Sequence, residues 1–395
     1  MDLIVFPFVD LKKCQVEGFR TRDAHLIEEL SKDDRINSIL VIDRPISIVE
    51  ILFKRRWWKV KGGDVLYQHK NACLTRLSPK VYVLDIIVLD VLTPVVLKHA
   101  WITRIFSNKK IQKYISDAIN YLSLSDYGLF AFSPLAYPVL GGFNEKYSVF
   151  FAVDNWLEHP QLSSGKKVVE IGYEKFKKNA DVIITTSHKL SDFFDRAQKK
   201  VFTVFNGVDK ERFKCADYGV PHDLVSIKAR KVGYAGKIQE RLDIELVKYL
   251  AADNEDVVFV FIGEVTSKRH FDELKGVPNV IYLGDKHYDD LPKYLCAFDL
   301  CIIPHVINCL SESMSPLKLY EYLAADKDVV TTSVSGLEDV TEKVVIARNK
   351  EEFSMAIKNR LAAKSSKAFD VPYEWSWRAK CDKILSIVTT TVKLD

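Results

Sequence analysis

Short apolar runs alternate along the chain with segments whose hydrophobic residues repeat at helical spacing. This alternation is typical of βαβ units, in which parallel strands are covered by helices, and it predicts an α/β fold. In the first half of the chain we expect strands near residues 3–9, 37–42, 81–90, 127–132, 147–152, 181–185 and 201–205, and helices near residues 22–32, 108–122, 166–179 and 187–196.

The same rhythm starts again at Lys231. The segment Phe205-Asn206-Gly207-Val208-Asp209 carries a strong turn signal, and the stretch that follows it to residue 230 is polar and irregular. The chain, at 395 residues, is long enough for two cores. We therefore predict one domain over 1–205, a second over 206–375 and a closing helix over 376–395 that crosses back to the first. The second domain should hold strands near 231–235, 256–262, 279–283, 298–303 and 328–332, and helices near 242–252, 287–297 and 315–325.

Several familiar site motifs are missing from the sequence. It contains no GxGxxG fingerprint, Walker A loop, HExxH or GxSxG, which disfavours NAD enzymes, P-loop NTPases, zincins and α/β-hydrolases. Doubly wound sheets bind ligands beyond the carboxyl ends of their strands. Two Rossmann-like doubly wound domains that face each other would enclose a central cleft, and we expect the site there.

Cysteine use, hydropathy and charge indicate the cellular compartment of the protein and the classes of partner it suits. The seven cysteines are scattered and form no CxxC pair, which predicts reduced thiols, no disulfide framework and no zinc site. No apolar run reaches the roughly 18 residues that a membrane-spanning helix needs. The first residues resemble a buried strand more than a signal peptide, so we expect a cytoplasmic protein. The net charge of +4 is concentrated in the first half, which suits an anionic surface or acceptor and is far from the balance of a nucleic-acid-binding protein.

Blocks of residues in order along the chain resemble GT-B glycosyltransferases, in particular bacterial polysaccharide transferases of the teichuronic-acid and xanthan glucuronosyltransferase type. The resemblance spans nearly the whole chain. Single blocks are weak, and their order and spacing carry the specificity. The blocks are Ala180-Asp181-Val182-Ile183-Ile184-Thr185-Thr186-Ser187, Asn206-Gly207-Val208-Asp209, Val232-Gly233-Tyr234-Ala235-Gly236-Lys237, Phe259-Val260-Phe261-Ile262-Gly263 and Ser315-Pro316-Leu317-Lys318-Leu319-Tyr320-Glu321-Tyr322-Leu323-Ala324.

This resemblance implies a donor site for a nucleotide sugar in the second domain. The helix that opens at Ser315, Pro316 and Leu317 would offer N–H groups and a positive dipole end to a diphosphate. Lys318 would reach the same phosphates, and Glu321 would accept hydrogen bonds from the ribose hydroxyls. An amphipathic helix with a solvated face is the alternative reading. Four further residues are expected at the donor: Gly236, Lys237 and Arg241 at the diphosphate, and Glu264 at the nucleoside.

In the first domain the resemblance points to Asp154, which ends an apolar strand, as the general base. The alternative is an aspartate that caps a short helix. His25 is a rival base or acceptor ligand, although a packed or capping histidine is the commoner case. We expect the acceptor to be bound by Arg22, His25, Asn155 and Trp156.

The family's retaining members usually carry Glu-x7-Glu, and here the first position is Ser313, with Glu312 beside it. This departure, together with Asp154, favours inversion of the anomeric centre, while retention stays open. A non-catalytic GT-B scaffold or glycan-binding partner and a nucleotide-sugar epimerase are further alternatives. No Asp-x-Asp metal motif is convincing, so we expect neither a metal nor a required cofactor.

Two basic and aromatic stretches of the first half, Phe53–Lys61 and Lys98–Lys113, suit peripheral contact with the inner face of an anionic membrane. The alternative is surface charge over a packed Trp pair. Together these features predict an enzyme that moves a sugar from a nucleotide diphosphate, with UDP favoured, to a hydroxyl of a saccharide acceptor. In this family that acceptor is often lipid-linked and belongs to a growing surface polysaccharide.

Overall fold

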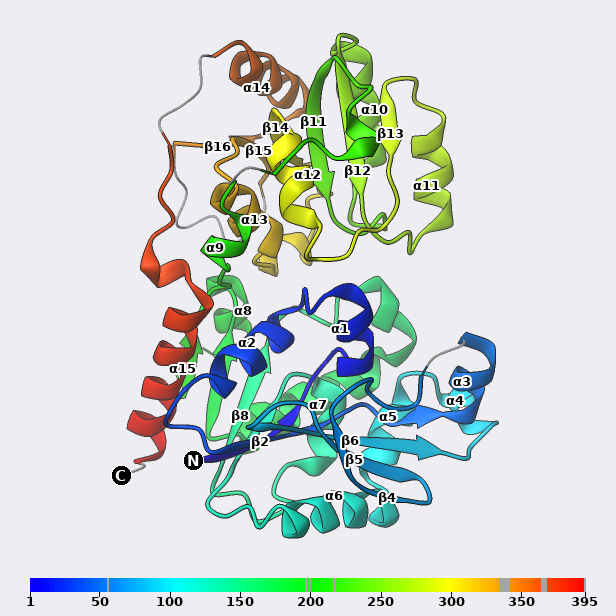
Figure 1. Cartoon of the computed structure of the whole chain (residues 1–395), viewed down its shortest axis with the longest axis vertical. Helices are drawn as coiled ribbons and strands as arrows, with labels where there is room; N and C mark the ends of the chain where they lie inside the picture. Colours follow the sequence, from blue (N-terminus) through cyan, green and yellow to red (C-terminus); the bar gives the residue numbers. More distant parts are fainter. Residues whose placement is uncertain are drawn as a thin grey trace. The chain divides into compact units, whose positions relative to one another are not determined.

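The computed structural model of the chain describes residues 1–54, 57–195, 198, 200–215, 218–333, 342–363 and 368–393. It divides into two compact units (Figure 1). Unit 1 contains residues 1–204 and 381–395, and unit 2 contains residues 205–380. The predicted boundary at residue 205 therefore lies next to the observed division, and the final helix contributes residues to both units.

Unit 1 is built on a sheet with the strand order β10-β9-β8-β7-β1-β2-β6-β5-β4, and β3 pairs with β6 outside this path. Pairing is parallel from β10 through to β6, and the hairpin of β4 and β5 adds an antiparallel edge. The strands are β1 (Asp2–Phe6), β2 (Ser38–Ile42), β3 (Ile46–Ser47), β4 (Asp64–His69), β5 (Ala72–Arg76), β6 (Val81–Val88), β7 (Gly128–Ala131), β8 (Tyr147–Ala152), β9 (Val182–Thr185) and β10 (Val201–Thr203).

Helices cover both faces of this sheet. In α7, for example, Val169, Tyr173 and Phe176 recur at helical spacing and are buried, which is the reason this segment folds as a helix against the strands. The helices are α1 (Leu11–Glu17), α2 (Arg22–Ser31), α3 (Ile48–Lys54), α4 (Thr93–Leu97), α5 (Ala100–Phe106), α6 (Lys109–Tyr121), α7 (Lys166–Asn179), α8 (His188–Phe193) and α15 (Trp377–Val392).

Unit 2 has a parallel sheet in the order β13-β12-β11-β14-β15-β16. Its strands are apolar and largely buried, as expected for a parallel sheet covered on both faces. The strands are β11 (Arg230–Ala235), β12 (Val257–Ile262), β13 (Val280–Tyr282), β14 (Leu300–Ile303), β15 (Val329–Thr332) and β16 (Val344–Ala347), and the helices are α9 (Lys210–Phe213), α10 (Ile244–Asp253), α11 (Lys268–Lys275), α12 (Leu291–Ala297), α13 (Leu317–Ala324) and α14 (Lys350–Ala362).

The predicted α/β class with two Rossmann-like units is confirmed, and the predicted strands and helices appear at their expected places. The last residue of the helix predicted over 187–196 lies outside the described residues. The β4–β5 hairpin was not predicted. Its register shifts between Val65 and Tyr67, and β4 is exposed or half-buried throughout, so the period-two pattern of a strand is lost there.

One expectation about the cysteines was wrong. Cys215, two residues after α9, forms a disulfide with Cys296 on α12 across a sequence separation of 81 residues. The spacing of the cysteines could not reveal this pair, because tertiary packing alone brings α9 and α12 together. The other five cysteines are free, and four of them are buried.

Within the described ranges, no helix is long and apolar enough to cross a membrane. Over the same residues, no group of three or more His, Cys, Asp and Glu side chains is placed to hold a metal ion.

Candidate functional site

The strand order of unit 2 reverses between β11 and β14, which pair through Val232 and Leu300. In doubly wound sheets such a reversal leaves a crevice beyond the carboxyl ends of the two strands, and ligands bind there. Gly236 follows β11 directly, and His305 comes two residues after β14. The predicted donor residues therefore gather around the point at which this fold binds its ligands.

The backbone at this point is packed closely around two glycines. The N–H of Gly236 donates to the carbonyl oxygen of Ile262 at 2.8 Å. Gly263 has a φ of +143°, and a Cβ built on it would lie 2.1 Å from the carbonyl oxygen of Gly236. A residue with a side chain at position 263 would therefore be strained and would clash with backbone, so the loops after β11 and β12 depend on glycine.

Lys318, the second residue of α13, is half-buried and lies against this glycine floor. A Cβ on Gly236 would meet its Nζ at 2.3 Å, and the ammonium lies 4.0 Å from the centroid of the Tyr234 ring. Burial, reinforced by the charge of Arg241, holds the pKa of Lys318 well below its ordinary value, although Glu321 acts in the opposite direction. Among the residues that the structure describes, Lys318 forms no ion pair with a carboxylate.

His305 provides a neutral partner for this lysine. Its Nε2 lies 3.3 Å from Lys318 Nζ, and the imidazole is buried. Burial and the charges of Lys318 and Arg241 lower the pKa of His305 well below its usual range. A neutral ring can accept a hydrogen bond from the ammonium group, which explains how the two basic residues coexist.

Two further polar atoms at this crevice are buried and have no hydrogen-bond partner in the described part of the chain: Arg241 Nε and Ser315 Oγ. The loop that carries Arg241 is tied to the end of β14, since the N–H of Val306 donates to the Arg241 carbonyl at 2.9 Å. The backbone carbonyl of Ser315 accepts a 2.6 Å bond from Asn206 Nδ2. Buried polar atoms normally find partners, so these two mark a place for a polar ligand.

Glu321 lies one turn further along α13 and is 8% exposed. Its Oε1 accepts a hydrogen bond from the Tyr288 hydroxyl at 3.0 Å. Burial first, and the Glu321 carboxylate second, raise the pKa of Tyr288 well above its ordinary value, so this hydroxyl stays protonated and donates. Glu321 is therefore held in place by a neutral hydroxyl donor, which adds no second negative charge beside it.

The remaining predicted donor residues lie at the rim. Lys237 Nζ forms an ion pair with Glu264 Oε2 at 3.4 Å, and both side chains are 37% exposed. Pro316 occupies the N-cap position of α13, which begins at Leu317 without a side-chain cap. The free N–H groups of its first turn are therefore not occupied by a capping side chain.

In unit 1, Asp154 lies in the loop after β8, as predicted. Its backbone carbonyl accepts a hydrogen bond from the Tyr173 hydroxyl at 2.8 Å, and the same hydroxyl accepts from the N–H of Trp156 at 3.0 Å. The Asn155 side chain accepts from the N–H of Leu157. A buried tyrosine of α7 therefore holds the loop in place. Asp154 is half-buried and comes just after the carboxyl end of β8.

The predicted acceptor residues on α2 connect to this loop through Phe8. Phe8 stacks on Trp156 with ring centroids 4.0 Å apart, and its N–H donates to Asp23 at 3.0 Å. Arg22 and His25 flank Asp23 and are buried, and the Arg22 guanidinium donates to the Val204 carbonyl at 3.1 Å. Of the predicted acceptor residues, Asn155 and Trp156 lie in the same loop as Asp154. The guanidinium of Arg22 bonds instead to the backbone carbonyl of Val204.

Unit 1 also buries a charge cluster that the sequence patterns did not reveal. Lys12 Nζ lies 2.7 Å from Asp43 and 2.7 Å from Asp85. Burial alone would lower the pKa of Lys12, but the two carboxylates raise it above its ordinary value. Burial also raises the pKa of Asp43, to about 7. Each carboxylate accepts a backbone N–H as well, from Leu11 and Val60 respectively.

The two basic and aromatic stretches of unit 1 differ in exposure. Phe53 and Trp57 are 82% and 61% exposed, whereas Trp101 and Phe106 are buried in the core. Arg55 and Arg56 lie outside the described residues. Helix α5 turns the aromatic side chains of Lys98–Lys113 inward, so membrane contact through this stretch would depend on its basic residues and stays a prediction.

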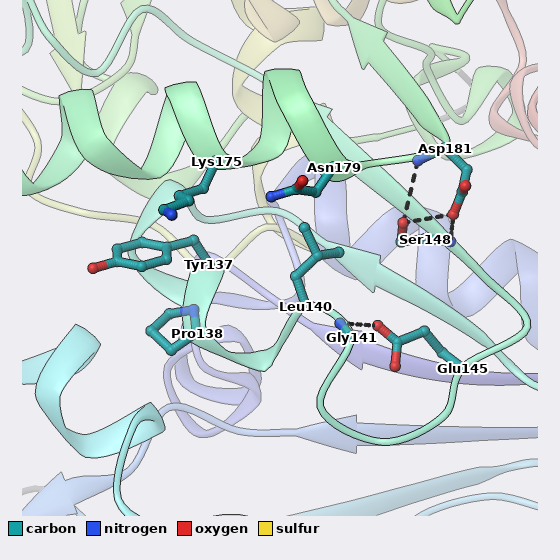
Figure 2. A pocket seen from close by; sticks show the side chains of 9 residues that line it. All are labelled: Tyr137, Pro138, Leu140, Gly141, Glu145, Ser148, Lys175, Asn179 and Asp181. Carbon is teal, nitrogen blue, oxygen red and sulfur yellow. Dashed lines mark hydrogen bonds between the residues drawn. The ribbon is translucent and has the colours of Figure 1, made fainter.

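A pocket of about 510 Å³ opens at the other edge of the unit 1 sheet (Figure 2). Ser148, at the start of β8, and Asp181, just before β9, form its floor and bond to each other. Lys175 and Asn179 reach it from α7. None of the predicted site residues lines this pocket, which lies at the amino ends of the strands and away from Asp154.

Comparison with known families places the crevice of unit 2 in context. Residues 229–363 match the family described as glycosyl transferases group 1. This range begins at β11 and runs through α14. Unit 2 therefore contains a group 1 glycosyltransferase domain.

A curated relative supports the same assignment. The chain is 30% identical over 176 residues to TuaH of Bacillus subtilis (strain 168), a protein provisionally named a teichuronic acid biosynthesis glycosyltransferase. The alignment covers 43% of this chain and 44% of that protein, so it spans less than half of either.

Solved structures extend the likeness to the whole fold. The catalytic domain of starch synthase IV from Arabidopsis thaliana, bound to ADP and acarbose, matches with a TM-score of 0.70 at 11% identity, over 100% of this chain and 99% of that one. Anabaena Alr3699/HepE, in complex with UDP and glucose, matches with a TM-score of 0.61 at 13% identity, over 99% and 97%. The chain has the GT-B architecture that its sequence resembles.

The group 1 domain contains every predicted donor residue, from Gly236 to Glu321, and excludes the acceptor set of unit 1. Sequence reasoning missed His305, Tyr234 and Tyr288. His305 could have been found, because it is a polar residue just beyond the carboxyl end of a predicted strand. Tyr288 had no such signal, since only the fold brings it to Glu321.

Proposed function

We propose that the protein is a glycosyltransferase that moves a sugar from a nucleotide-diphosphate donor to a hydroxyl of a saccharide acceptor. The observation that carries the proposal is the excess of positive charge at the unit 2 crevice. Lys318 and Arg241 lie there without an ion-pair partner among the described residues, next to a buried Ser315 hydroxyl that has no hydrogen bond. A diphosphate would supply the charge and the acceptors that these groups lack.

Glu321 and Tyr288 are assigned to the nucleoside end of the donor. A buried carboxylate with one oxygen bonded to Tyr288 still has lone pairs that can accept hydrogen bonds from both ribose hydroxyls. Lys237, at the rim, would move from Glu264 to the diphosphate when the donor binds, and Glu264 would then face the nucleoside. The first turn of α13, which follows Pro316, adds the N–H groups of Leu317 and Lys318 for the same anion.

UDP is the favoured nucleotide, and the acceptor is proposed to be a lipid-linked saccharide of a bacterial surface polysaccharide. The complex of Anabaena Alr3699/HepE with UDP and glucose supports the first choice. The name of TuaH, which refers to teichuronic acid biosynthesis, supports the second. The groups of the crevice suit a diphosphate and a ribose, which all nucleoside-diphosphate sugars share.

Asp154 is proposed as the general base of an inverting displacement. It lies at the carboxyl edge of the unit 1 sheet, in a loop fixed by Tyr173, where a carboxylate can take the proton of an acceptor hydroxyl. Retention is the competing outcome. Product analysis by NMR decides between them, because an inverting enzyme gives the anomer opposite to that of the donor.

The donor site is tested first by thermal unfolding with UDP, GDP and dTDP. A nucleotide at 100 times its Kd should add about 2.7 kcal/mol of stability, a shift of roughly 5–10 °C for units of this size. We expect one nucleotide to stabilise the wild type and the effect to vanish in Glu321→Ala. Glu245→Ala, at an exposed position of α10, is the matched control and should respond like the wild type. If no nucleotide stabilises the wild type, the donor assignment fails.

Turnover separates an enzyme from a binding scaffold. Asp154→Asn should keep the nucleotide-induced stabilisation and lose sugar transfer by about 10²–10⁴-fold, the usual contribution of general base catalysis. A wild type that binds nucleotide but transfers no sugar to any saccharide acceptor would favour the scaffold instead.

A further inference from the structure

Large apolar side chains are exposed at one end of unit 1. Leu92, Val96 and Phe53 are 76%, 75% and 82% exposed, where a folded domain normally buries such residues. We refer to the set as the β6-end patch, which consists of Leu52, Phe53, Trp57, Leu89, Val91, Leu92, Val95 and Val96.

These residues come from three segments that leave the sheet together. Ser47 of β3 pairs with Val88 of β6, so α3 and the segment after β6 start side by side. The third segment, which holds Trp57, is tied back to β6 by the Val60 N–H, which donates to Asp85 at 2.9 Å. Figure 1 shows α3 and α4 at the same end of unit 1. The patch is therefore one surface and not a scatter of single exposed residues.

The exposure is built into the local structure. Leu97, at the end of α4, packs against the unit 1 core, and Trp101 in the next helix is buried. Asp90 accepts from the Thr93 N–H at 3.1 Å and caps the start of α4. Because α4 is anchored at both ends, its Val95 and Val96 are held outward at 63% and 75% exposure.

The sequence segments that carry the patch are rich in basic residues. Residues 52–61 and 89–113 together contain ten Lys and Arg residues and a single acid, Asp90. That acid is engaged by Thr93, whose hydrogen bonds lower the pKa of Asp90. Lys61 Nζ lies 4.3 Å from the centroid of the exposed Trp57 ring. An apolar surface with a tryptophan and a cationic rim matches the boundary of an anionic bilayer.

We propose that the β6-end patch docks unit 1 onto an anionic lipid membrane, with its aliphatic residues and Trp57 inserted at headgroup depth. Lys59, Lys61 and Lys98 then contact the lipid phosphates. The patch extends the proposed function by naming the surface that would bring the enzyme to a lipid-linked acceptor. It stands on unit 1 alone, so it can hold even if the donor assignment fails.

The test is co-sedimentation of the full chain, without nucleotide, with vesicles of phosphatidylcholine alone or with 30% phosphatidylglycerol. The wild type should bind the anionic vesicles and bind the neutral ones at least about tenfold more weakly, and it should be released by 0.5 M salt. Brominated lipid should quench tryptophan fluorescence, and Trp57→Phe should reduce that quenching. Equal binding to both kinds of vesicle would overturn the electrostatic part of the proposal.

A matched pair of double variants tests the location. Val95→Asp with Val96→Asp should lower the partition coefficient on anionic vesicles by about a hundredfold, since two aliphatic anchors are lost and two negative charges are added. Val220→Asp with Val225→Asp makes the same chemical change at valines of unit 2 that are 57% and 53% exposed. The control pair should bind like the wild type, about a hundredfold more tightly than the patch pair, and equal partition of the two pairs would overturn the proposal.

A milder change guards against misfolding of the patch variant. Lys59→Ser with Lys61→Ser leaves the aliphatic residues in place and should weaken binding to anionic vesicles by about tenfold, without effect on neutral ones. Sedimentation equilibrium distinguishes a second copy of the chain as occupant. A wild type that dimerises through the patch and ignores vesicles would overturn the lipid assignment.

Discussion

Unit 1 buries a lysine, Lys12, and unit 2 holds a half-buried one, Lys318, and the two lysines are in opposite electrostatic states. In unit 1, Lys12 sits 2.7 Å from each of two carboxylates, which raise its pKa above the ordinary value. In unit 2, burial and Arg241 push the pKa of Lys318 well below the ordinary value, and only Glu321 opposes them. A buried cation that is fully paired supports the fold, whereas one that lacks its anion is available to a ligand.

The polar groups around the two lysines differ in the same way. The carboxylates around Lys12 accept backbone N–H groups from Leu11 and Val60, so charge and hydrogen bonds are satisfied together. Around Lys318, Arg241 Nε and Ser315 Oγ have no hydrogen bond within the described ranges. The cluster around Lys12 is therefore satisfied by its own carboxylates, whereas the crevice around Lys318 has room for an added anion.

The largest expected effect comes from breaking the complete cluster. Lys12→Met leaves two buried carboxylates without their cation, which should lower the free energy of unfolding of unit 1 by about 3–5 kcal/mol. Urea unfolding measures it. The conservative variant Lys12→Arg should recover part of the loss. A Lys12→Met protein as stable as the wild type would show that the carboxylates are not ionised in the folded state.

Lys318→Met should have the opposite effect: it should weaken nucleotide binding and not lower the free energy of unfolding. Removing a cation that has no carboxylate partner among the described residues should leave stability unchanged or slightly higher, because a half-buried charge is replaced by an apolar chain of similar length. Nucleotide-diphosphate affinity should fall by roughly 30- to 200-fold, the value of a charge-assisted hydrogen bond of about 2–3 kcal/mol. Titration calorimetry with UDP measures it, and Lys286→Met, at the half-buried pair with Asp223, is the control.

These two variants also show how far the sequence could lead. Gly236, Lys318 and Glu321 were predicted because they fall at strand ends and helix starts, and a parallel fold brings such positions to one edge. Lys12, Asp43 and Asp85 were not predicted, since they are distant in sequence and only packing unites them. The disulfide of Cys215 was missed for the same reason. The fold follows local pattern, and the pairing of buried groups depends on tertiary structure.

A smaller effect is expected in the pH dependence of UDP affinity, which tests whether Lys318 lacks an anion in the free protein. A bound diphosphate favours the protonated form of Lys318, so donor binding should take up a proton wherever the free site is deprotonated. Since the pKa of Lys318 is lowered in the free protein, affinity for UDP should rise as the pH falls from the ordinary pKa of lysine towards the lowered one, by at most tenfold per pH unit. Binding heats in buffers of different ionisation enthalpy report the proton uptake, which Lys318→Met should abolish.

The smallest effect is expected from Tyr288→Phe. The tyrosine hydroxyl bonds Glu321 Oε1 at 3.0 Å and keeps the carboxylate of α13 aimed at the crevice. Without that bond Glu321 can turn towards Lys318 and provide the anion that this lysine lacks. Nucleotide affinity should then fall by about 3- to 10-fold, in line with the net contribution of one hydrogen bond that positions Glu321 indirectly, and the pH dependence of binding should flatten as the pKa of Lys318 rises. A loss larger than that of Lys318→Met would show instead that Glu321, held by Tyr288, contributes more to donor binding than the buried cation, and that the comparison of the two lysines does not explain the site.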